Sequence, residues 1–242
     1  KGTPSGRRRF LDMEISQTSA TYYHQLMQYN RLLQQRNAIL KEYRGKQNIP
    51  LEEWDLQLAD MASFIVKKRL ESLKKINLLI DLMNRKLTGG LENLTIGYEQ
   101  SYMDNGSLEY TKEGFYERIK AALPQDRHRM TTSVGPHRDD LRFFSDAMDL
   151  KKFGSQGQQR TAVLSLKLSE LEFIKSEVGE YPVLLLDDVL SELDESRRAN
   201  LLQFIHKRIQ TFITTTDIHD FKDLKSVQFI SCEGGKVQYG QP

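Results

Sequence analysis

Two neighbouring carboxylates and a glycine-rich turn are the residues of this 242-residue sequence whose types and spacing could do chemistry. Asp187 and Asp188 follow the apolar run Val183-Leu184-Leu185-Leu186, which is typical of a strand covered on both faces. Open α/β sheets bind ligands beyond the carboxyl ends of their strands, so both carboxylates are expected at a ligand site. One of them can hold Mg²⁺, and the other can orient the water that attacks a phosphate.

The turn from Gly154 to Thr161 suits the same kind of ligand. Glycines let backbone N–H groups approach an anion, and Ser155 adds a hydroxyl donor. Apolar residues at helical spacing follow from Val163 to Ile174, which predicts a helix whose positive end faces the turn. The turn and the carboxylates together predict a nucleotide-phosphate site, or half of one.

The sequence lacks the loop that normally cradles nucleotide phosphates. That loop needs Gly-x-x-x-x-Gly-Lys followed by Ser or Thr, because the lysine reaches the terminal phosphates and the hydroxyl holds Mg²⁺. Gly45-Lys46 is followed by Gln47, Gly235-Lys236 is followed by Val237, and neither pair has the earlier glycine. The turn from Gly154 to Thr161 and the carboxylates Asp187 and Asp188 therefore predict only part of an ATP site.

Several motifs carry a resemblance to a known family. Ser155-Gln156-Gly157-Gln158 resembles the signature motif of ABC-type ATPases, and the strand that ends in Asp187-Asp188 resembles their Walker B strand. Ser191-Glu192-Leu193-Asp194 resembles the D-loop. With Arg7-Arg8-Arg9-Phe10-Leu11-Asp12 and Gly135-Pro136-His137-Arg138-Asp139-Asp140, these stretches are similar to the bacterial RecF family of recombinational-repair ATPases, which is related to the SMC proteins.

The resemblance implies an α/β fold, a partial ABC-type ATPase head formed by its carboxyl-terminal lobe, with an inserted antiparallel helical arm. Residues 1–129 are expected to form mostly the arm, with a small strand and helix return, and residues 130–242 the head. In this family the P-loop lies in an N-terminal portion. The chain is therefore expected to be a C-terminal fragment that cannot hydrolyse ATP alone.

The resemblance also implies roles for single residues in a two-protomer site. Ser155, Gly157 and Gln158 would contact, in trans, ATP that sits on the P-loop of another subunit. Asp187 would position Mg²⁺, and Asp188 would orient the attacking water. Ser191 and Asp194 belong to the D-loop, and Thr216 takes the position where most ABC proteins have a histidine.

Cofactors and partners follow from the same resemblance. ATP and Mg²⁺ are expected only together with the missing P-loop portion. The expected partners are gapped DNA with its single- and double-stranded parts, a second copy of the chain, and RecR, in a cytoplasmic, nucleoid-associated protein that assists recombinase loading. A nucleotide-independent DNA-binding module and a structural SMC-like head and arm remain as alternatives.

Two basic runs are candidates for contacts with DNA. Arg7, Arg8 and Arg9 could bind phosphate, although such a run is more often solvated or paired with acids. Lys67, Lys68 and Arg69 lie in the predicted arm, where they could form a basic face with the nearby cations Arg31, Arg36, Lys74 and Lys75. The net charge of +2 requires any DNA surface to come from such local clusters.

His137, Asp139 and Asp140 lie within four residues of one another, which admits two interpretations. A metal site would need a supporting His or Cys cluster, and the sequence offers none. The favoured alternative is a structural ion-pair network between Arg138 and its acidic neighbours. The single cysteine, Cys232, permits no internal disulfide, and no apolar run reaches the length of a membrane span.

Periodicity and turn residues predict the remaining elements. Residues 1–17 are expected to be a loop leading into a helix over 18–44. A second helix of nearly forty residues, with start signals at residues 48–53 and an end at Gly89-Gly90, is expected to form the arm with it. A helix over 111–123 should stop at Pro124. The other predicted features are strands at 94–98, 130–134, 141–144 and 210–214, a turn at Asp104-Asn105-Gly106, helices at 197–208 and 221–224, and a hairpin of 227–231 with 236–239.

Overall fold

The computed structural model describes residues 2–44, 49–90, 92–101, 110–206, 208–221 and 227–240. The predicted turn at Asp104-Asn105-Gly106 lies outside these ranges. The chain divides into two compact units, Lys1–Pro182 and Val183–Pro242, and each is described by itself. The boundary predicted between residues 129 and 130 was drawn from the resemblance to the arm and head of the family, not from the compactness of the chain. It stays a prediction.

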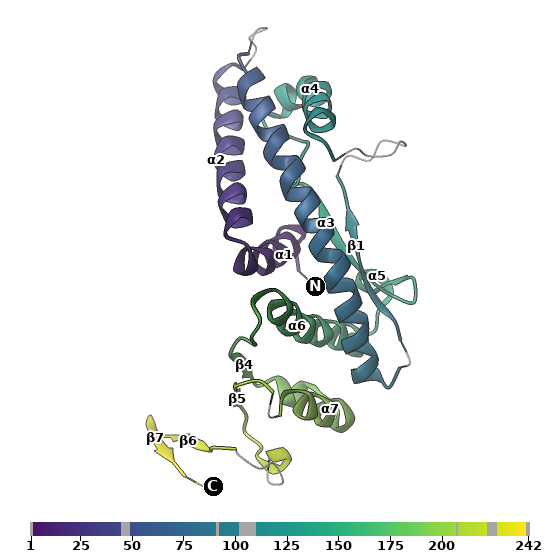
Figure 1. Ribbon diagram of the computed structural model, residues 1–242, viewed down its shortest axis with the longest axis vertical. Helices are drawn as coiled ribbons and strands as arrows, with labels where there is room; N and C mark the ends of the chain where they lie inside the picture. The colour runs from purple at the N-terminus through teal and green to yellow at the C-terminus, as the bar shows by residue number, and fades with distance from the viewer. Residues whose placement is uncertain are drawn as a thin grey trace. The chain divides into compact units, whose positions relative to one another are not determined.

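Unit 1 (Lys1–Pro182) consists of helices around one small antiparallel sheet (Figure 1). Its helices are α1 Pro4–Thr18, α2 Ala20–Glu42, α3 Glu52–Thr88, α4 Lys112–Arg129, α5 Leu150–Phe153 and α6 Gln156–Val178. Its strands are β1 Leu94–Glu99, β2 Asp140–Ser145 and β3 Met148–Asp149, hydrogen-bonded in the order β1-β2-β3. The helices predicted for the arm and the strands at 94–98 and 141–144 are confirmed.

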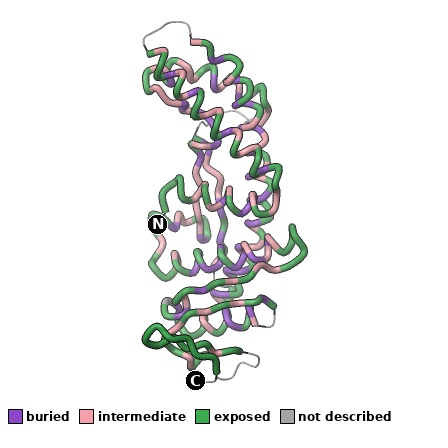
Figure 2. The backbone as a smooth tube through the Cα atoms, turned by 90° about the vertical axis from the view of Figure 1, so that its left-hand side faces the viewer, coloured by how far each residue is buried: buried purple, intermediate pink, exposed green. Residues whose placement is uncertain are grey.

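Helix α3 is the central helix of unit 1 and packs against α2, α4, α6 and β1. Acidic residues in its first turn and Gly89, in the left-handed conformation with φ of 67°, favour its two ends. Its 37 residues span about 56 Å at a rise of 1.5 Å per residue. Buried positions recur along its whole length (Figure 2), because different parts of the helix pack against different neighbouring elements. The antiparallel pair of α2 and α3 forms the predicted arm.

The prediction that residues 1–17 form a loop is wrong, because α1 occupies them. Thr3 caps this helix by accepting a hydrogen bond from the amide of Gly6 at 3.1 Å, and Pro4 takes the first helical position. Leu11 and Ile15, one turn apart, are buried in the core of unit 1. The burial of this pair holds α1 in place.

The predicted stop at Pro124 is also wrong, because α4 continues to Arg129. Pro124 lacks the amide that would bond one turn back, which normally ends a helix. The turn after it is held instead by Asp126, which is fully buried and accepts hydrogen bonds from Arg36 of α2 and from Ser133. Tertiary pairing of Asp126 therefore overrides the local effect of the proline.

Residues 130–134 do not form the predicted strand. Met130 ends α4 in the left-handed conformation with φ of 51°. The amide of Thr132 then donates to the side chain of Asn37 at 2.8 Å, and that of Ser133 donates to Asp126 at 2.9 Å. Side chains satisfy the backbone donors that a sheet would have paired.

Unit 2 (Val183–Pro242) contains a two-stranded parallel sheet and a hairpin. Its elements are β4 Leu184–Asp187, the 3₁₀ turn η1 Val189–Glu192, α7 Glu195–Ile205, β5 Thr211–Thr214, the 3₁₀ turn η2 His219–Phe221, β6 Ile230–Glu233 and β7 Lys236–Tyr239. Strand β4 pairs with β5 in a register that places Asp187 opposite Thr214, and β6 pairs with β7. The predicted strand at 210–214, the helix at 197–208 and the hairpin are confirmed; of the helix at 221–224, the described part is Phe221, in η2.

Strand β4 is not covered on both faces, as its apolar run predicted. Leu186 is buried, whereas Leu185 keeps 73% of its surface exposed. Alternating exposure of this kind is the pattern of a strand with one covered face. Among the helices that the structure describes, none combines the length and the apolarity that crossing a membrane requires.

Candidate nucleotide site

The signature-like residues lie at the start of α6 in unit 1. Ser155 is the cap of this helix: its Oγ accepts a hydrogen bond from the amide of Gln158 at 3.2 Å. The side-chain oxygen of Gln158 in turn accepts from the amide of Ser155 at 3.0 Å, which completes a capping box. Capping uses a lone pair of the Ser155 hydroxyl, so its proton stays available to donate to an anion.

Two glycines shape this turn for different reasons. A Cβ on Gly154 would lie 2.7 Å from the carbonyl oxygen of Leu150, so the tight turn between α5 and α6 excludes a side chain there. A Cβ on Gly157 would meet only the Ser155 Oγ, at 3.9 Å. Packing within the chain therefore explains Gly154, whereas the bare backbone at Gly157 leaves the helix start open to a ligand.

The carboxylate pair lies at the carboxyl end of β4 in unit 2, and both side chains are exposed. Thr214, at the end of β5, donates its hydroxyl to the Asp187 Oδ1. The amide of Asp188 donates to the Thr214 hydroxyl at 3.1 Å and to its carbonyl at 3.2 Å. Thr214 thus orients one carboxylate and anchors the backbone of the next, a role that only the strand register reveals.

Asp188 turns the chain sharply out of the sheet. Its φ of 50° and ψ of 21° lie in the left-handed region, which aspartate tolerates better than most residues with a side chain. Ser191 supports the turn by donating its hydroxyl to the Asp188 carbonyl at 2.8 Å. An unusual backbone conformation held in this way is common where side chains must be aimed at a ligand.

The donors at this strand end fit Mg²⁺. Asp187, Asp188 and Thr214 offer hard oxygen atoms, which this cation prefers. Within the described residues, neither carboxylate forms an ion pair with lysine or arginine. The described side chains form no cluster of three or more metal-binding groups, so the chain offers one or two ligands rather than a closed cage. That is how Mg²⁺ is usually held when phosphates supply the other ligands.

The candidate D-loop residues Ser191 and Asp194 follow the same turn. Asp194 caps α7 by accepting from the amide of Arg197 at 2.9 Å, and this hydrogen bond lowers the pKa of its carboxyl. Thr216 is exposed in the loop after β5, two residues beyond Thr214. Unit 2 therefore brings together the acids, the D-loop and the Thr216 position, while the signature residues belong to unit 1.

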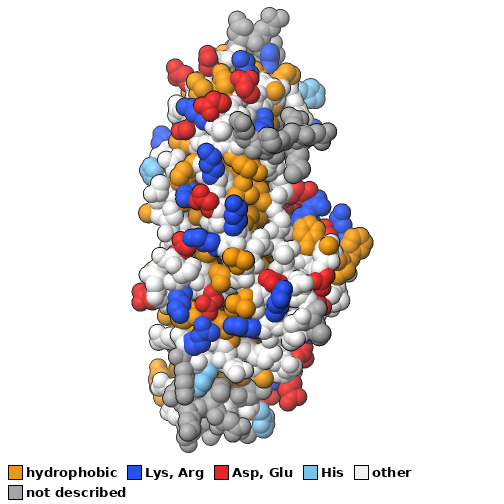
Figure 3. All heavy atoms as spheres, turned by 45° about the vertical axis from the view of Figure 1, so that its right-hand side comes forward, with side chains coloured by type: hydrophobic (Ala, Val, Ile, Leu, Met, Phe, Trp, Pro, Cys, Tyr) orange, Lys and Arg blue, Asp and Glu red, His pale blue; other side chains and the backbone are white. Residues whose placement is uncertain are grey.

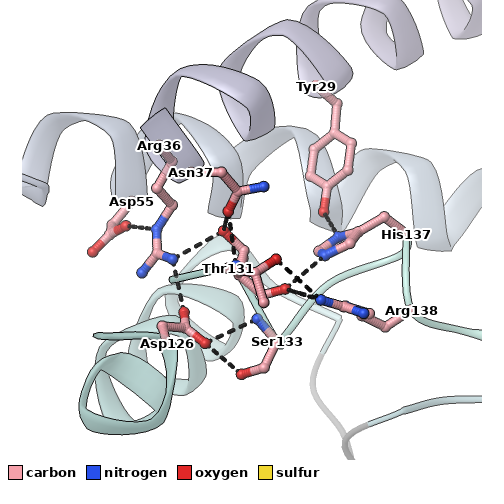
Figure 4. A network of polar contacts seen from close by, with 10 residues as sticks. Tyr29, Arg36, Asn37, Asp55, Asp126, Thr131, Ser133, His137 and Arg138 are labelled. Atoms are coloured by element: carbon pink, nitrogen blue, oxygen red, sulfur yellow. Dashed lines mark hydrogen bonds and ion pairs between the residues drawn. The ribbon is translucent and has the colours of Figure 1, made fainter. Parts of the chain in front are cut away.

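The motif from Gly135 to Asp140 serves structure rather than metal binding (Figure 4). His137 accepts the Tyr29 hydroxyl at its Nδ1 at 2.6 Å and donates from its Nε2 to the Thr132 carbonyl at 3.1 Å. Both ring nitrogens are thus engaged, and burial lowers the pKa of His137 to about 4. Arg138 donates to the Thr132 carbonyl, not to the acids beside it as predicted.

The acids of this motif pair with other parts of unit 1. Asp140 accepts from Arg7 of α1 at 2.6 Å, and Asp139 is fully buried and accepts the hydroxyl of Tyr98. The carbonyl of Asp139 accepts from Arg8 at 2.6 Å. Two of the three arginines that were candidates for DNA contacts therefore bind the protein itself, whereas the exposed Arg9 has no described hydrogen bond or ion pair.

The basic face predicted on the arm is smaller than the sequence indicates. Arg69 keeps only 2% of its surface exposed and donates to both carboxylate oxygens of Asp12 at 2.9 Å, so this candidate for DNA binding is wrong. Arg36 is fully buried as well. Lys68 pairs with Glu71 at 2.7 Å, and Lys67 is exposed. Figure 3 shows one face of the molecule, on which Lys and Arg lie among acidic and hydrophobic side chains.

Comparison with known proteins finds close relatives of this chain, although no family model matches it. A DNA replication and repair protein RecF from Alkaliphilus oremlandii is 49% identical over 227 residues, which cover 93% of this chain and 62% of the relative. The RecF protein of Halalkalibacterium halodurans is 44% identical and covers 98% of this chain and 66% of that protein. The chain thus spans just under two thirds of the length of these relatives.

Solved structures agree on the fold. A structure described as the recombination mediator protein RecF-ATPrS in the RecFOR pathway matches with a TM-score of 0.86 and 36% identity, over 99% of this chain and 64% of that one. An Smc head domain from Pyrococcus furiosus matches at a TM-score of 0.50 and 13% identity, which bears on the fold alone. The predicted fold, a partial ATPase head with a helical arm, is confirmed. The chain belongs to the bacterial RecF family.

Proposed function

We propose that the chain supplies one half of a composite ATP site in a DNA-repair ATPase of the RecF type. The observation that carries the proposal is the pair of exposed carboxylates at the end of β4, with Thr214 fixing Asp187 and the left-handed turn at Asp188. Exposed, unpaired acids at the carboxyl end of a parallel strand suit a metal-bound phosphate better than they suit packing.

Each residue then has a distinct task. Asp187, held by Thr214, binds Mg²⁺, which would neutralise phosphate charge when it is bound. Asp188 orients the water that attacks the terminal phosphate. Thr216 contributes a hydroxyl where most ABC proteins have a histidine. The D-loop residues Ser191 and Asp194 line the side of the site that faces the second protomer.

The start of α6 acts on a nucleotide bound by a second protomer. The Ser155 hydroxyl, the exposed backbone of Gly157 and the polar side chain of Gln158 approach the γ-phosphate in trans. Such a site exists only when two heads meet, so ATP stabilises a dimer and hydrolysis releases it. Because these 242 residues contain no P-loop, the chain alone neither binds nor hydrolyses ATP.

The biological role follows from the relatives. They are named DNA replication and repair proteins, and the solved structures are named recombination mediators of the RecFOR pathway. We infer a cytoplasmic protein that binds gapped DNA as an ATP-dependent homodimer, works with RecR and assists recombinase loading. The burial of Arg36 and Arg69 removes these two cations from the basic face predicted on the arm.

Two substitutions in a protein that also carries the P-loop portion test the proposal. Asp188→Asn should keep ATP-driven dimerisation and lose most hydrolysis, and normal turnover would remove Asp188 from the water-orienting role. Ser155→Arg should prevent ATP-dependent dimerisation, measured by analytical ultracentrifugation, while ATP binding by single protomers continues. Ser176→Arg, an exposed serine in the last turns of α6, is the matched control. Normal dimers with Ser155→Arg would contradict the contact in trans.

A further inference from the structure

Unit 1 contains a hollow that the ATP site does not use. It has a volume of about 410 Å³ and lies between α1, α2 and the turn at Pro136-His137. Tyr29, His137 and Arg69 are among its deepest lining residues, and Arg8, Arg9 and Tyr23 line it nearer the surface. This volume lies in the lower part of the range of about 300–1,000 Å³ that small-molecule sites occupy.

The inner residues are held rigidly by one another. Tyr29 donates to His137 at 2.6 Å, and the low pKa of His137, caused first by its burial, keeps the imidazole neutral. Arg69 is bound on both sides, by Asp12 through two hydrogen bonds at 2.9 Å and by the Pro136 carbonyl at 2.7 Å. These residues give a fixed surface, and Asp12, the one acid among the described lining residues, is already paired with Arg69.

Of the two outer arginines, Arg9 is the one that the described residues leave without a partner. Arg8 donates to the Asp139 carbonyl, and its pKa is lowered first by burial and then by the nearby charge of Arg69, while the charges of Asp140, Asp139 and Asp12 raise it. Arg9 is exposed, and the described residues give it no hydrogen bond or ion pair. A phosphate group beside these guanidinium groups would accept hydrogen bonds from them and be stabilised by their charge.

An aromatic ring stands at the rim of the same hollow. Tyr23 keeps 55% of its surface exposed, and Met13, which lines the same hollow, keeps 49% exposed. Asn30 adds a side-chain amide with donors and an acceptor. An exposed ring and arginines that line one hollow are the kinds of side chain that hold unpaired bases and phosphates in proteins that bind single strands.

We propose that this hollow binds one nucleotide of single-stranded DNA, with Arg9 on the phosphate and Tyr23 against the base. The proposal rests on the proposed function, in that it assumes that the chain acts on DNA. A single strand is favoured over a duplex because a base is free to stack on a side chain only when it is unpaired.

Fluorescence anisotropy with a labelled oligothymidylate tests the proposal on the whole chain. Tyr23→Ala should weaken binding roughly 5- to 150-fold, the range measured for loss of one stacked base. Arg9→Ala should lower the slope of log affinity against log salt by about 0.7, as expected for one lost phosphate contact. Arg44→Ala and Tyr239→Ala, exposed residues outside the hollow, should leave binding unchanged. All four positions are exposed, and circular dichroism verifies that each variant folds.

Each contrary outcome has a defined meaning. Equal binding by Tyr23→Ala, Arg9→Ala and the unaltered chain would overturn the hollow and leave the composite ATP site standing. No oligothymidylate binding by the unaltered chain would also overturn the hollow, while the Ser155→Arg dimerisation test decides the ATP site separately. Displacement of the oligonucleotide by dTMP or inorganic phosphate at equal concentration, or an equal loss of duplex binding in Tyr23→Ala, would overturn the assignment to a single strand.

Discussion

The two units of the chain use charged residues in opposite ways. In unit 1, Arg36 and Arg69 are almost completely enclosed, and carboxylates of neighbouring elements pair with them. In unit 2, Asp187 and Asp188 are exposed and have no described ion pair. Enclosed pairs fix how helices meet, and removal of one partner is costly. Exposed acids on a constrained turn contribute little to folding and remain free for a ligand, so burial, rather than charge, separates structure from binding here.

Arg36→Met should give the largest effect, because it leaves Asp126 and Asp55 buried without their cation (Figure 4). We expect a loss of about 3–5 kcal/mol in the free energy of unfolding. Urea denaturation followed by the fluorescence of Trp54, the single tryptophan and part of α3, reports on unit 1. Arg31→Met, at an exposed position of the same helix α2, should cost less than about 0.5 kcal/mol. Equal effects of the two changes would contradict the contrast between the units.

Glu170 should make the stability of unit 1 depend on pH. Burial, reinforced by the charge of Glu14, raises the pKa of Glu170 to about 7, well above the ordinary 4.5. The folded chain therefore binds more protons than the unfolded chain between these values, and the contribution of Glu170 to stability is lost as pH rises from 4.5 through 7. Glu170→Gln should remove this loss and increase stability at pH 8 by up to about 3 kcal/mol.

Urea titrations from pH 4 to 8 measure this effect, with exposed Glu180→Gln as the control. His137 acts in the opposite direction, since its lowered pKa of about 4 costs stability as pH falls from 6.5 through 4. The comparison of Glu170→Gln with the unaltered chain separates the two groups. An unchanged pH profile in Glu170→Gln would show that its carboxyl is not proton-linked to folding.

Gly135→Ala tests how tightly the network around His137 is packed. A Cβ there would collide with the Tyr29 hydroxyl, and the φ of 133° disfavours any side chain. We expect a loss of about 2 kcal/mol. Gly179→Ala is the control, since Gly179 has φ of 97° but open space around it, and should cost only about 1 kcal/mol. If adding Tyr29→Phe to Gly135→Ala recovers no stability, the collision is not the cause.

Asp187→Asn should give the smallest effect on folding. Its carboxylate is exposed and has only the Thr214 hydroxyl as a described partner, so the free energy of unfolding should change by less than about 0.5 kcal/mol. Thermal unfolding followed by circular dichroism measures it. A large destabilisation would place Asp187 with the structural charges of unit 1 and remove it as the candidate Mg²⁺ ligand.

Local patterns in the sequence were enough to predict the long helices, the hairpin and the motif positions. The helix α1 was missed, although Thr3-Pro4 is a start signal. The extension of α4 past Pro124 depends on Arg36, 90 residues from Asp126 in the sequence, and no local pattern reports such a pair.

In the candidate site, too, local sequence patterns predicted the positions of the motifs but not the contacts that depend on the fold. Glycine, serine and acidic residues marked the turn at Ser155 and the strand end at Asp187, but not which atoms support them. Thr214 was missed because its role depends on the register of β4 with β5. Arg69 looked like its neighbours Lys67 and Lys68, and only its place on the inner side of α3 distinguishes it.

ATP hydrolysis by mixed polypeptides tests the composite site most directly. The 242-residue chain would be assayed alone and after addition of a separate polypeptide that carries the P-loop portion of a RecF protein. A composite site predicts no turnover by either polypeptide, turnover on mixing, and loss of that turnover when the chain carries Asp188→Asn. Hydrolysis by the chain alone would contradict a composite site, because it would require a phosphate cradle within these residues.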